Sequence, residues 1–151
     1  MDISDYVKAR KEGLKAYTTA VQKGEDPLMA VLEKKVPALN QLTRLPLGVH
    51  TIPLNDVVGT ETQSRAFAFA NNFMPILDAS TEFASKWALL CESVKQDGVR
   101  QPVKALEYLG KYYLIEGNKR VSVSKYLHVD YLEADLTRVI PLRTEEPEIV
   151  A

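Results

Sequence analysis

The sequence predicts an α+β protein with a small mixed sheet, helices that flank it and a helical hairpin in front. Three observations lead to this prediction. The chain has 151 residues and 46% hydrophobic content, which fits one globular domain. Apolar residues recur at helical spacing near the N-terminus. Short β-prone runs separated by glycine turns dominate the last third of the chain.

Residues 1–46 are expected to form the helical hairpin as an N-terminal extension. Residues 3–23 carry apolar side chains on one helical face. Asp26 and Pro27 suit the N-cap and the first turn of a second helix, which would run to about residue 36. The hairpin contains no recognisable chemical motif, so we expect it to serve packing or a partner.

The main domain is expected over residues 47–141. Its first half is expected to contain, in order, a strand at 48–54, a polar loop at 59–65, a short helix at 66–70, and a longer helix that Ser80 or Thr81 caps and Gly98 ends. Its second half is expected to contain strands at 103–108 and 111–115, a helix from Gly117 to about Leu127, and strands at 131–135 and 138–140. Residues 142–151 are expected to be an acidic tail or linker.

The composition excludes several classes of protein. The single cysteine, Cys91, excludes an internal disulfide framework and a cysteine-rich zinc module. His50 and His128 lie too far apart in the sequence for a short metal-binding motif, and no metal site is expected. No apolar stretch approaches the length of a membrane helix, and the N-terminus lacks the pattern of a signal peptide. We therefore expect a cytoplasmic protein without membrane contact.

The strongest chemical signal is a strand that enters a glycine turn and continues directly into a helix. Gly117 is followed by Asn118, Lys119 and Arg120 in the first helical turn. Free N–H groups at a helix start attract anions, whereas cations there oppose the helix dipole unless an anion is present. This pattern indicates a phosphate site in which Arg120 holds phosphate. The alternative is a purely structural turn in which Glu116 pairs with Lys119 or Arg120.

The charge distribution agrees with an anion site in this part of the chain. The net charge of the whole chain is −1, which argues against a general polyanion binder. Residues 98–128, however, carry six Lys or Arg residues against Glu107 and Glu116, so that this segment is basic and the remainder is acidic. A charged segment of this kind is also typical of a solvated face.

The order of these motifs resembles the N-terminal domain of ParB proteins, which have the ParB/sulfiredoxin-like fold. The resemblance covers about residues 47–141 and includes ParB-like modules that begin some larger bacterial proteins. In ParB, a Gly-Glu-Arg-Arg turn binds nucleotide phosphates, and it matches Gly117 to Arg120 here. The resemblance implies a nucleotide- or phosphate-binding site at the following residues: Gly117, Asn118, Lys119, Arg120, Arg65, Gln63, Thr60 and Gln101.

The resemblance also implies ligands and partners. A nucleoside triphosphate, CTP or ATP with Mg²⁺, is the expected ligand, and nucleotide-dependent closure of a homodimer is the expected consequence. An association with DNA processes is expected, although the helix-turn-helix that follows the domain in ParB would begin after residue 141. The chain departs from the ParB pattern at Asn118 and Lys119, and Ser64 replaces the proline of the second loop.

Other activities on the same cleft are alternatives. Sulfiredoxin chemistry needs a cysteine in the turn, and Asn118 occupies that position. A metal-dependent nuclease would need Asp56, Glu61 and Glu116 to converge. A phosphotransferase would use Glu61 or Glu116 as its base. A non-enzymatic interaction domain with a basic patch is the remaining alternative.

Overall fold

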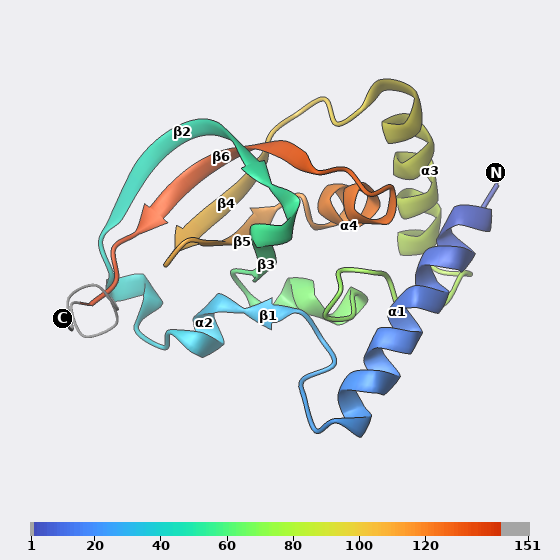
Figure 1. The fold of residues 1–151 in the computed structure, drawn as a ribbon, viewed down its shortest axis with the longest axis horizontal. Helices are drawn as coiled ribbons and strands as arrows, with labels where there is room; N and C mark the ends of the chain where they lie inside the picture. Colours follow the sequence, from blue (N-terminus) through green and yellow to red (C-terminus); the bar gives the residue numbers. More distant parts are fainter. Residues whose placement is uncertain (1, 143–151) are drawn as a thin grey trace.

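The computed structural model describes residues 2–142, and in these residues it contains a six-stranded mixed sheet with helices packed around it (Figure 1). The elements, in order, are α1 (Ser4–Gln22), β1 (Ala30–Val31), α2 (Leu32–Lys35), β2 (Arg44–Pro53), β3 (Val57–Thr60), the 3₁₀ helix η3 (Gln63–Ala68), α3 (Glu82–Asp97), β4 (Val103–Tyr108), β5 (Lys111–Glu116), α4 (Asn118–Tyr126) and β6 (Tyr131–Val139). The predicted α+β class with a small mixed sheet and flanking helices is confirmed. The predicted tail at 142–151 lies outside the described residues except for Leu142.

The sheet combines parallel and antiparallel neighbours in the order β1-β3-β5-β4-β6-β2. β1 and β3 are parallel, as are β3 and β5, and β4 and β6. β4 pairs antiparallel with β5 through the turn at Gly110, and β2 pairs antiparallel with β6. Because β3 and β5 are parallel neighbours, their carboxyl ends lie at the same edge of the sheet.

The predicted helical hairpin is wrong in its second half. α1 forms as expected, but Asp26 does not cap a helix, and its carboxylate instead accepts a hydrogen bond from the backbone N–H of Leu28 at 3.0 Å. The chain then enters the sheet as β1, where Ala30 pairs with Gly59. The segment before residue 46 thus forms the outermost strand of the same sheet.

The apolar pattern of this segment has a different cause from the predicted helix. Met29 and Val31 pack in the core that also contains Val103 and Leu114. Leu32 and Val36, Leu106 and Tyr113 belong to a second core. Neighbouring strand residues point to opposite faces, so the two cores lie on the two faces of the sheet. The segment supplies apolar side chains to both, which a single helical face cannot do.

Two further predictions at strand level are corrected. The region after the turn at 55–56 contains β3, a buried strand, before the polar loop begins at Glu61. The two C-terminal strands predicted at 131–135 and 138–140 are one continuous strand, β6. The short helix predicted at 66–70 is η3, which begins and ends earlier. Thr81 caps α3 by accepting a hydrogen bond from the N–H of Ala84.

α1, α3 and α4 gather at one end of the sheet (Figure 1). A third core joins them and centres on Trp87, which packs edge-on against Tyr6 and Tyr126. The indole N–H of Trp87 also donates to Ser122 Oγ on α4 at 2.9 Å. These contacts fix the position of α4, which carries the glycine turn predicted as a site.

The N-terminal end of α1 is held by a partly exposed polar contact. Asp5 accepts a hydrogen bond from the Tyr126 hydroxyl at 2.8 Å and pairs with Lys95 at 2.5 Å. The hydrogen bonds from Lys95 and Tyr126 lower the pKa of Asp5 below its ordinary value. A lowered pKa in the folded state means that ionised Asp5 stabilises the fold.

We expect Asp5→Asn to lower the free energy of unfolding by about 1–3 kcal/mol at neutral pH. The contribution of ionised Asp5 is complete above its ordinary pKa and disappears as the pH falls through the lower pKa of the folded state. Denaturant unfolding across the acid range measures this. Glu12→Gln on the exposed side of α1 is the matched control, and an equal pH dependence in both variants would contradict the assignment.

Candidate functional site

The glycine turn between β5 and α4 is fixed by a close contact with the sheet. Gly117 has a φ of +100°, a conformation that favours glycine. A Cβ at this position would lie 2.5 Å from Val103 Cγ1 on β4. The chain can therefore turn from the strand into the helix here only without a side chain.

α4 begins immediately after this turn, and no side chain caps it. Its first N–H groups have no carbonyl partner within the helix, because such partners would lie before the helix begins. The side chain of Asn118 is buried here with 8% exposure, and its Oδ1 has no hydrogen-bond partner among residues 2–142. An unsatisfied buried acceptor costs about 1–3 kcal/mol, and a hydrogen-bond donor supplied by a ligand would offset this cost.

The side chain of Arg120 is held mainly by two backbone carbonyls. Its Nη1 donates to the backbone carbonyls of Gln101 at 2.9 Å and Pro102 at 3.1 Å. Its Nη2 lies 3.4 Å from Glu116 Oε1. The Glu116–Arg120 pair of a purely structural turn is therefore present. Arg120 lines the cavity, but with both terminal nitrogens engaged it joins the first turn of α4 to the start of β4.

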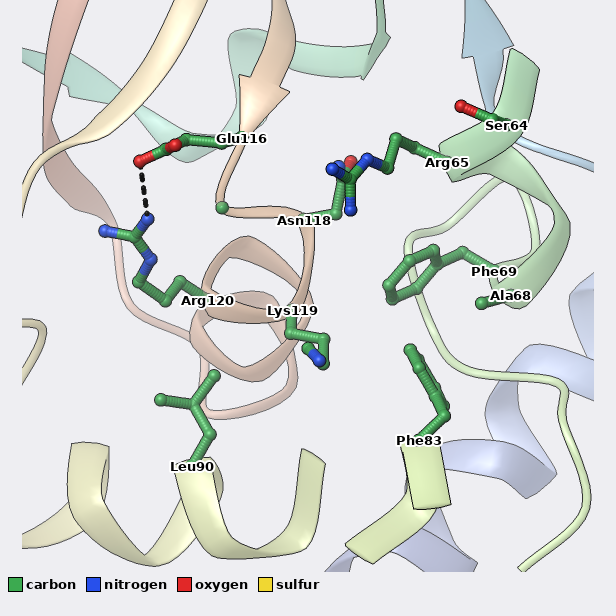
Figure 2. Close-up of a pocket in the computed structure, with 11 residues that line it drawn as sticks. Ser64, Arg65, Ala68, Phe69, Phe83, Leu90, Glu116, Asn118, Lys119 and Arg120 are labelled. Atoms are coloured by element: carbon green, nitrogen blue, oxygen red, sulfur yellow. Dashed lines mark hydrogen bonds and ion pairs between the residues drawn. The ribbon is translucent and has the colours of Figure 1, made fainter. Parts of the chain in front are cut away.

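The second predicted loop reaches the same place from the neighbouring strand. β3 ends at Thr60, whose hydroxyl donates to the carbonyl of Leu114 on β5 at 3.0 Å. Glu33 then anchors the loop, because its carboxylate accepts from the Gln63 N–H and its N–H donates to the Glu61 carbonyl. η3 follows and carries Arg65 toward the glycine turn (Figure 2).

A cavity of about 440 Å³ lies between the glycine turn, η3 and α3. Asn118 and Arg65 overlap in the view of Figure 2 and both line the cavity, while Lys119 points toward Phe83. The lining residues come from η3 and the residue after it, α3, the end of β5, the glycine turn and the start of α4: Ser64, Arg65, Ala68, Phe69, Phe83, Leu90, Glu116, Gly117, Asn118, Lys119 and Arg120. The structure thus brings together Arg65 and the predicted residues of the glycine turn.

The polar part of the cavity is cationic. Among residues 2–142, Arg65 and Lys119 form no ion pair, whereas Lys86 pairs with Glu82 on the same helix. Burial, followed by the charges of Lys86 and Arg65, lowers the pKa of Lys119 below its ordinary value. The Lys119 ammonium lies 5.7 Å from the centroid of the Phe83 ring. An anion bound beside Lys119 would offset the unfavourable effect of these neighbouring positive charges.

Four predicted residues lie outside the lining of this cavity. Thr60 is fully buried and bonded to β5, and Gln63 is held by Glu33. Gln101 contributes its carbonyl to Arg120, but its side chain lines a different cavity. Glu61 pairs with Arg44 at 3.2 Å. These residues support the loops that carry the site.

The three carboxylates that a nuclease would need do not converge. Asp56 pairs with Lys111, Glu61 with Arg44, and Glu116 with Arg120. No group of three or more metal-ligating His, Cys, Asp or Glu side chains occurs within residues 2–142. The nuclease alternative therefore lacks the convergence that it needs, because each carboxylate pairs with a separate cation.

The sequence did not indicate the apolar wall of the cavity. Phe83 and Leu90 lie one above the other on α3, and Phe69 follows η3 and meets Phe83 edge-on at 5.4 Å. Their spacing suggested only core packing, and Phe83 also packs against two cores. Because one ring can cover both a core and a cavity, spacing alone does not separate these roles.

Cys91 lies on the buried face of α3, as predicted. Burial raises the pKa of its thiol to about 11. The reactive form of cysteine is the thiolate, which is scarce at neutral pH under these conditions. The glycine turn has Asn118 in the position where sulfiredoxin chemistry needs a thiol.

Comparison with known proteins gives limited information. No protein-family model matches this chain, and no curated protein sequence matches it. Among solved structures, the chain is similar to sulfiredoxin from Arabidopsis thaliana, with 19% identity and a TM-score of 0.41. The similarity covers 58% of this chain and 82% of sulfiredoxin. At this level of similarity, the match supports no statement about the residues of the site.

Within residues 2–142, no helix is both long enough and apolar enough to span a bilayer.

We expect Gly117→Ala to destabilise the protein more than Gly110→Ala. Both glycines have positive φ, but an added Cβ meets Val103 only at Gly117, whereas it meets open space at Gly110. Gly110→Ala should cost about 1–2 kcal/mol through backbone conformation alone. Gly117→Ala should cost about 1–3 kcal/mol more through overpacking. Denaturant unfolding of both variants measures the difference, and equal losses would show that the Val103 contact does not constrain the turn.

We expect Cys91 to react slowly with a thiol reagent such as Ellman's reagent in the folded protein, because it is buried and protonated. After unfolding in denaturant the same thiol should react at the rate of a small-molecule thiol. Rapid reaction in native buffer, with the secondary structure intact by circular dichroism, would show that α3 opens or that Cys91 is accessible.

Proposed function

We propose that this chain is a nucleotide- or phosphate-binding module of the ParB-like kind and that the cavity at the start of α4 is its ligand site. The observation that supports this most directly is the buried side chain of Asn118, which lines the cavity and whose Oδ1 lacks a hydrogen-bond partner in the described part of the chain. A ribose hydroxyl or a base amino group would donate to this oxygen. Nucleotides carry such donors together with an anionic phosphate.

The proposed phosphate position lies between the first turn of α4 and Arg65. The free N–H groups at the start of α4 favour a negative charge. Arg65 has no ion pair within residues 2–142, and its charge contributes to the lowered pKa of Lys119. A phosphate would receive hydrogen bonds from the helix start and charge from both side chains.

The apolar wall is the proposed contact for the remainder of the nucleotide. Phe69 and Phe83 present aromatic rings to the cavity, and Leu90 continues this surface along α3. A planar base packs well against aromatic side chains. Phosphate at one side and an apolar wall at the other together match the two chemical halves of a nucleotide.

A phosphotransferase reaction would need a carboxylate base near the phosphate. Of the two predicted candidates, Glu116 lines the cavity, whereas Glu61 does not. Glu116 already pairs with Arg120. Binding is therefore the function that the geometry supports best. Turnover, a nucleotide-dependent homodimer, association with DNA and a cytoplasmic location stay predictions from the sequence.

Isothermal titration of the purified chain with CTP, ATP, GTP and ADP, with and without Mg²⁺, tests the proposal. Inorganic phosphate is the minimal probe. We expect saturable binding of at least one nucleotide. Arg65→Ala should weaken it by about tenfold or more, because a hydrogen bond to a charged group is lost. Arg65→Ala should leave the melting temperature nearly unchanged, since the side chain has no ion pair to lose within residues 2–142.

Arg120→Ala tests whether the Arg120 side chain stabilises the fold rather than binds the ligand. It should lower the melting temperature, because two backbone carbonyls lose their donor. Arg138→Ala is the matched control. Arg138 forms an ion pair with Glu107, near the end of β4 that is farther from the glycine turn. It should leave the affinity unchanged. Absence of binding for every nucleotide, or equal affinity in Arg65→Ala and the unmodified chain, would overturn the proposal.

A further inference from the structure

The positive charges that line the cavity at the start of α4 are only partly neutralised by the protein. Arg65, Lys119 and Arg120 line it together with one carboxylate, that of Glu116. Glu116 pairs with Arg120. Arg65 and Lys119 form no ion pair among residues 2–142, and we call these two residues the unpaired cations of the cavity.

The two unpaired cations affect each other electrostatically. The charge of Arg65 is one cause of the lowered pKa of Lys119, after burial and the charge of Lys86. The Lys119 ammonium lies 5.7 Å from the centroid of the Phe83 ring, so an aromatic face rather than a carboxylate is its neighbour. A bound anion would offset the unfavourable effect of bringing these positive charges together.

The buried amide of Asn118 gives a second, independent indication of a ligand at this place. Asn118 is the first residue of α4 and lines the cavity, and its Oδ1 has no hydrogen-bond partner in the described part of the chain. A phosphate dianion has no proton to donate to this oxygen. A matching ligand therefore carries a hydroxyl or amino group in addition to its phosphate.

The carboxylates near the cavity do not suit Mg²⁺, the metal that the resemblance to ParB implies. Mg²⁺ in phosphate sites is usually held by one or two carboxylates together with the phosphates. The side chain of Glu116 points toward Arg120 and away from Arg65 in Figure 2, and its ion pair engages it. Glu61 pairs with Arg44 and does not line the cavity. A Mg²⁺ ion beside the unpaired cations would meet two positive charges without a free carboxylate.

The charge of the unpaired cations matches that of one phosphate monoester. Such a group carries a charge of about −1.5 to −2 at neutral pH. A triphosphate carries further negative charge, which enzymes that bind it neutralise with divalent metal ions. Two protein cations therefore balance a monophosphate but leave a triphosphate with excess negative charge.

We propose that the cavity binds a nucleoside monophosphate, as its dianion and without Mg²⁺. This inference rests on the proposed function and names the ligand class of the same site. The phosphate would accept hydrogen bonds from the N–H groups at the start of α4 and from Arg65 and Lys119. A ribose hydroxyl or a base amino group would donate to Asn118 Oδ1.

Isothermal titration of the full chain with AMP, CMP, GMP and UMP, in EDTA and in excess Mg²⁺, tests the proposal. For the monophosphate that binds most tightly, the matched ligands are its nucleoside, the methyl ester of its phosphate and its triphosphate. The nucleoside should bind at least about tenfold more weakly, because charge-assisted hydrogen bonds are lost. The methyl ester keeps one negative charge and should bind about threefold more weakly or worse.

Mg²⁺ gives the sharpest distinction between the two classes of nucleotide. Excess Mg²⁺ should leave the affinity for the monophosphate unchanged. It should weaken binding of the triphosphate, because the metal occupies phosphate oxygens that would otherwise face the unpaired cations. In EDTA the triphosphate should bind no more tightly than the monophosphate.

Lys119→Gln tests the charge balance within the chain. It should lower the affinity for the monophosphate by about tenfold and remove most of the preference over the methyl ester, because one cation fewer faces the phosphate. Lys11→Gln removes the same charge from the exposed surface of α1 and is the matched control. It should leave every affinity unchanged, and circular dichroism confirms that both variants are folded.

The contrary results separate this inference from the proposed function. A triphosphate that binds only with Mg²⁺, or more tightly with Mg²⁺ than the monophosphate does, would overturn the inference and leave nucleotide binding in place. Equal affinity for the monophosphate and its nucleoside or methyl ester, or equal affinities in Lys119→Gln and Lys11→Gln, would also overturn it. Absence of binding for every nucleotide would overturn both.

Discussion

The candidate site depends on the contact between Gly117 and Val103. Because a side chain at residue 117 would overlap Val103, the backbone of the turn lies directly against β4, and α4 starts at a fixed point above the sheet. Arg120 completes this arrangement by binding the carbonyls that precede β4. The buried amide of Asn118 and the free N–H groups of the first helical turn are held in place by these two contacts. A cavity with a rigid wall results.

The topology of the sheet explains why Arg65 meets this turn although more than fifty residues separate them. β3 and β5 are parallel neighbours, so the segments that follow them leave the sheet at the same edge. Thr60 joins the two strands at that edge through its bond to Leu114. β1 then covers the outer side of β3, and the absence of a side chain at Gly59 allows the Ala30 backbone to approach. The N-terminal segment is thus a necessary part of the sheet that supports the site.

The sequence predicted those parts of the fold that local signals determine. The caps at Thr81 and Gly98, the hairpin at Gly110 and the strand-turn-helix at Gly117 depend on neighbouring residues, and the structure has them at these positions. The prediction of a second N-terminal helix was wrong because Asp26 and Pro27 can begin either a helix or an isolated turn. Only the pairing of Ala30 with Gly59, which is distant in sequence, decides between them.

The same distinction applies to the site. The cations and the glycine of the turn could be recognised from sequence because their chemistry is local, whereas the aromatic wall depends on how α3 packs against η3. One further consequence concerns observation of the site in solution. The chain has a single tryptophan, and its indole N–H is bonded to Ser122, one helical turn beyond Asn118. Indole emission responds to hydrogen bonding and polarity, so Trp87 is an intrinsic fluorophore positioned to report displacement of α4, without any added label.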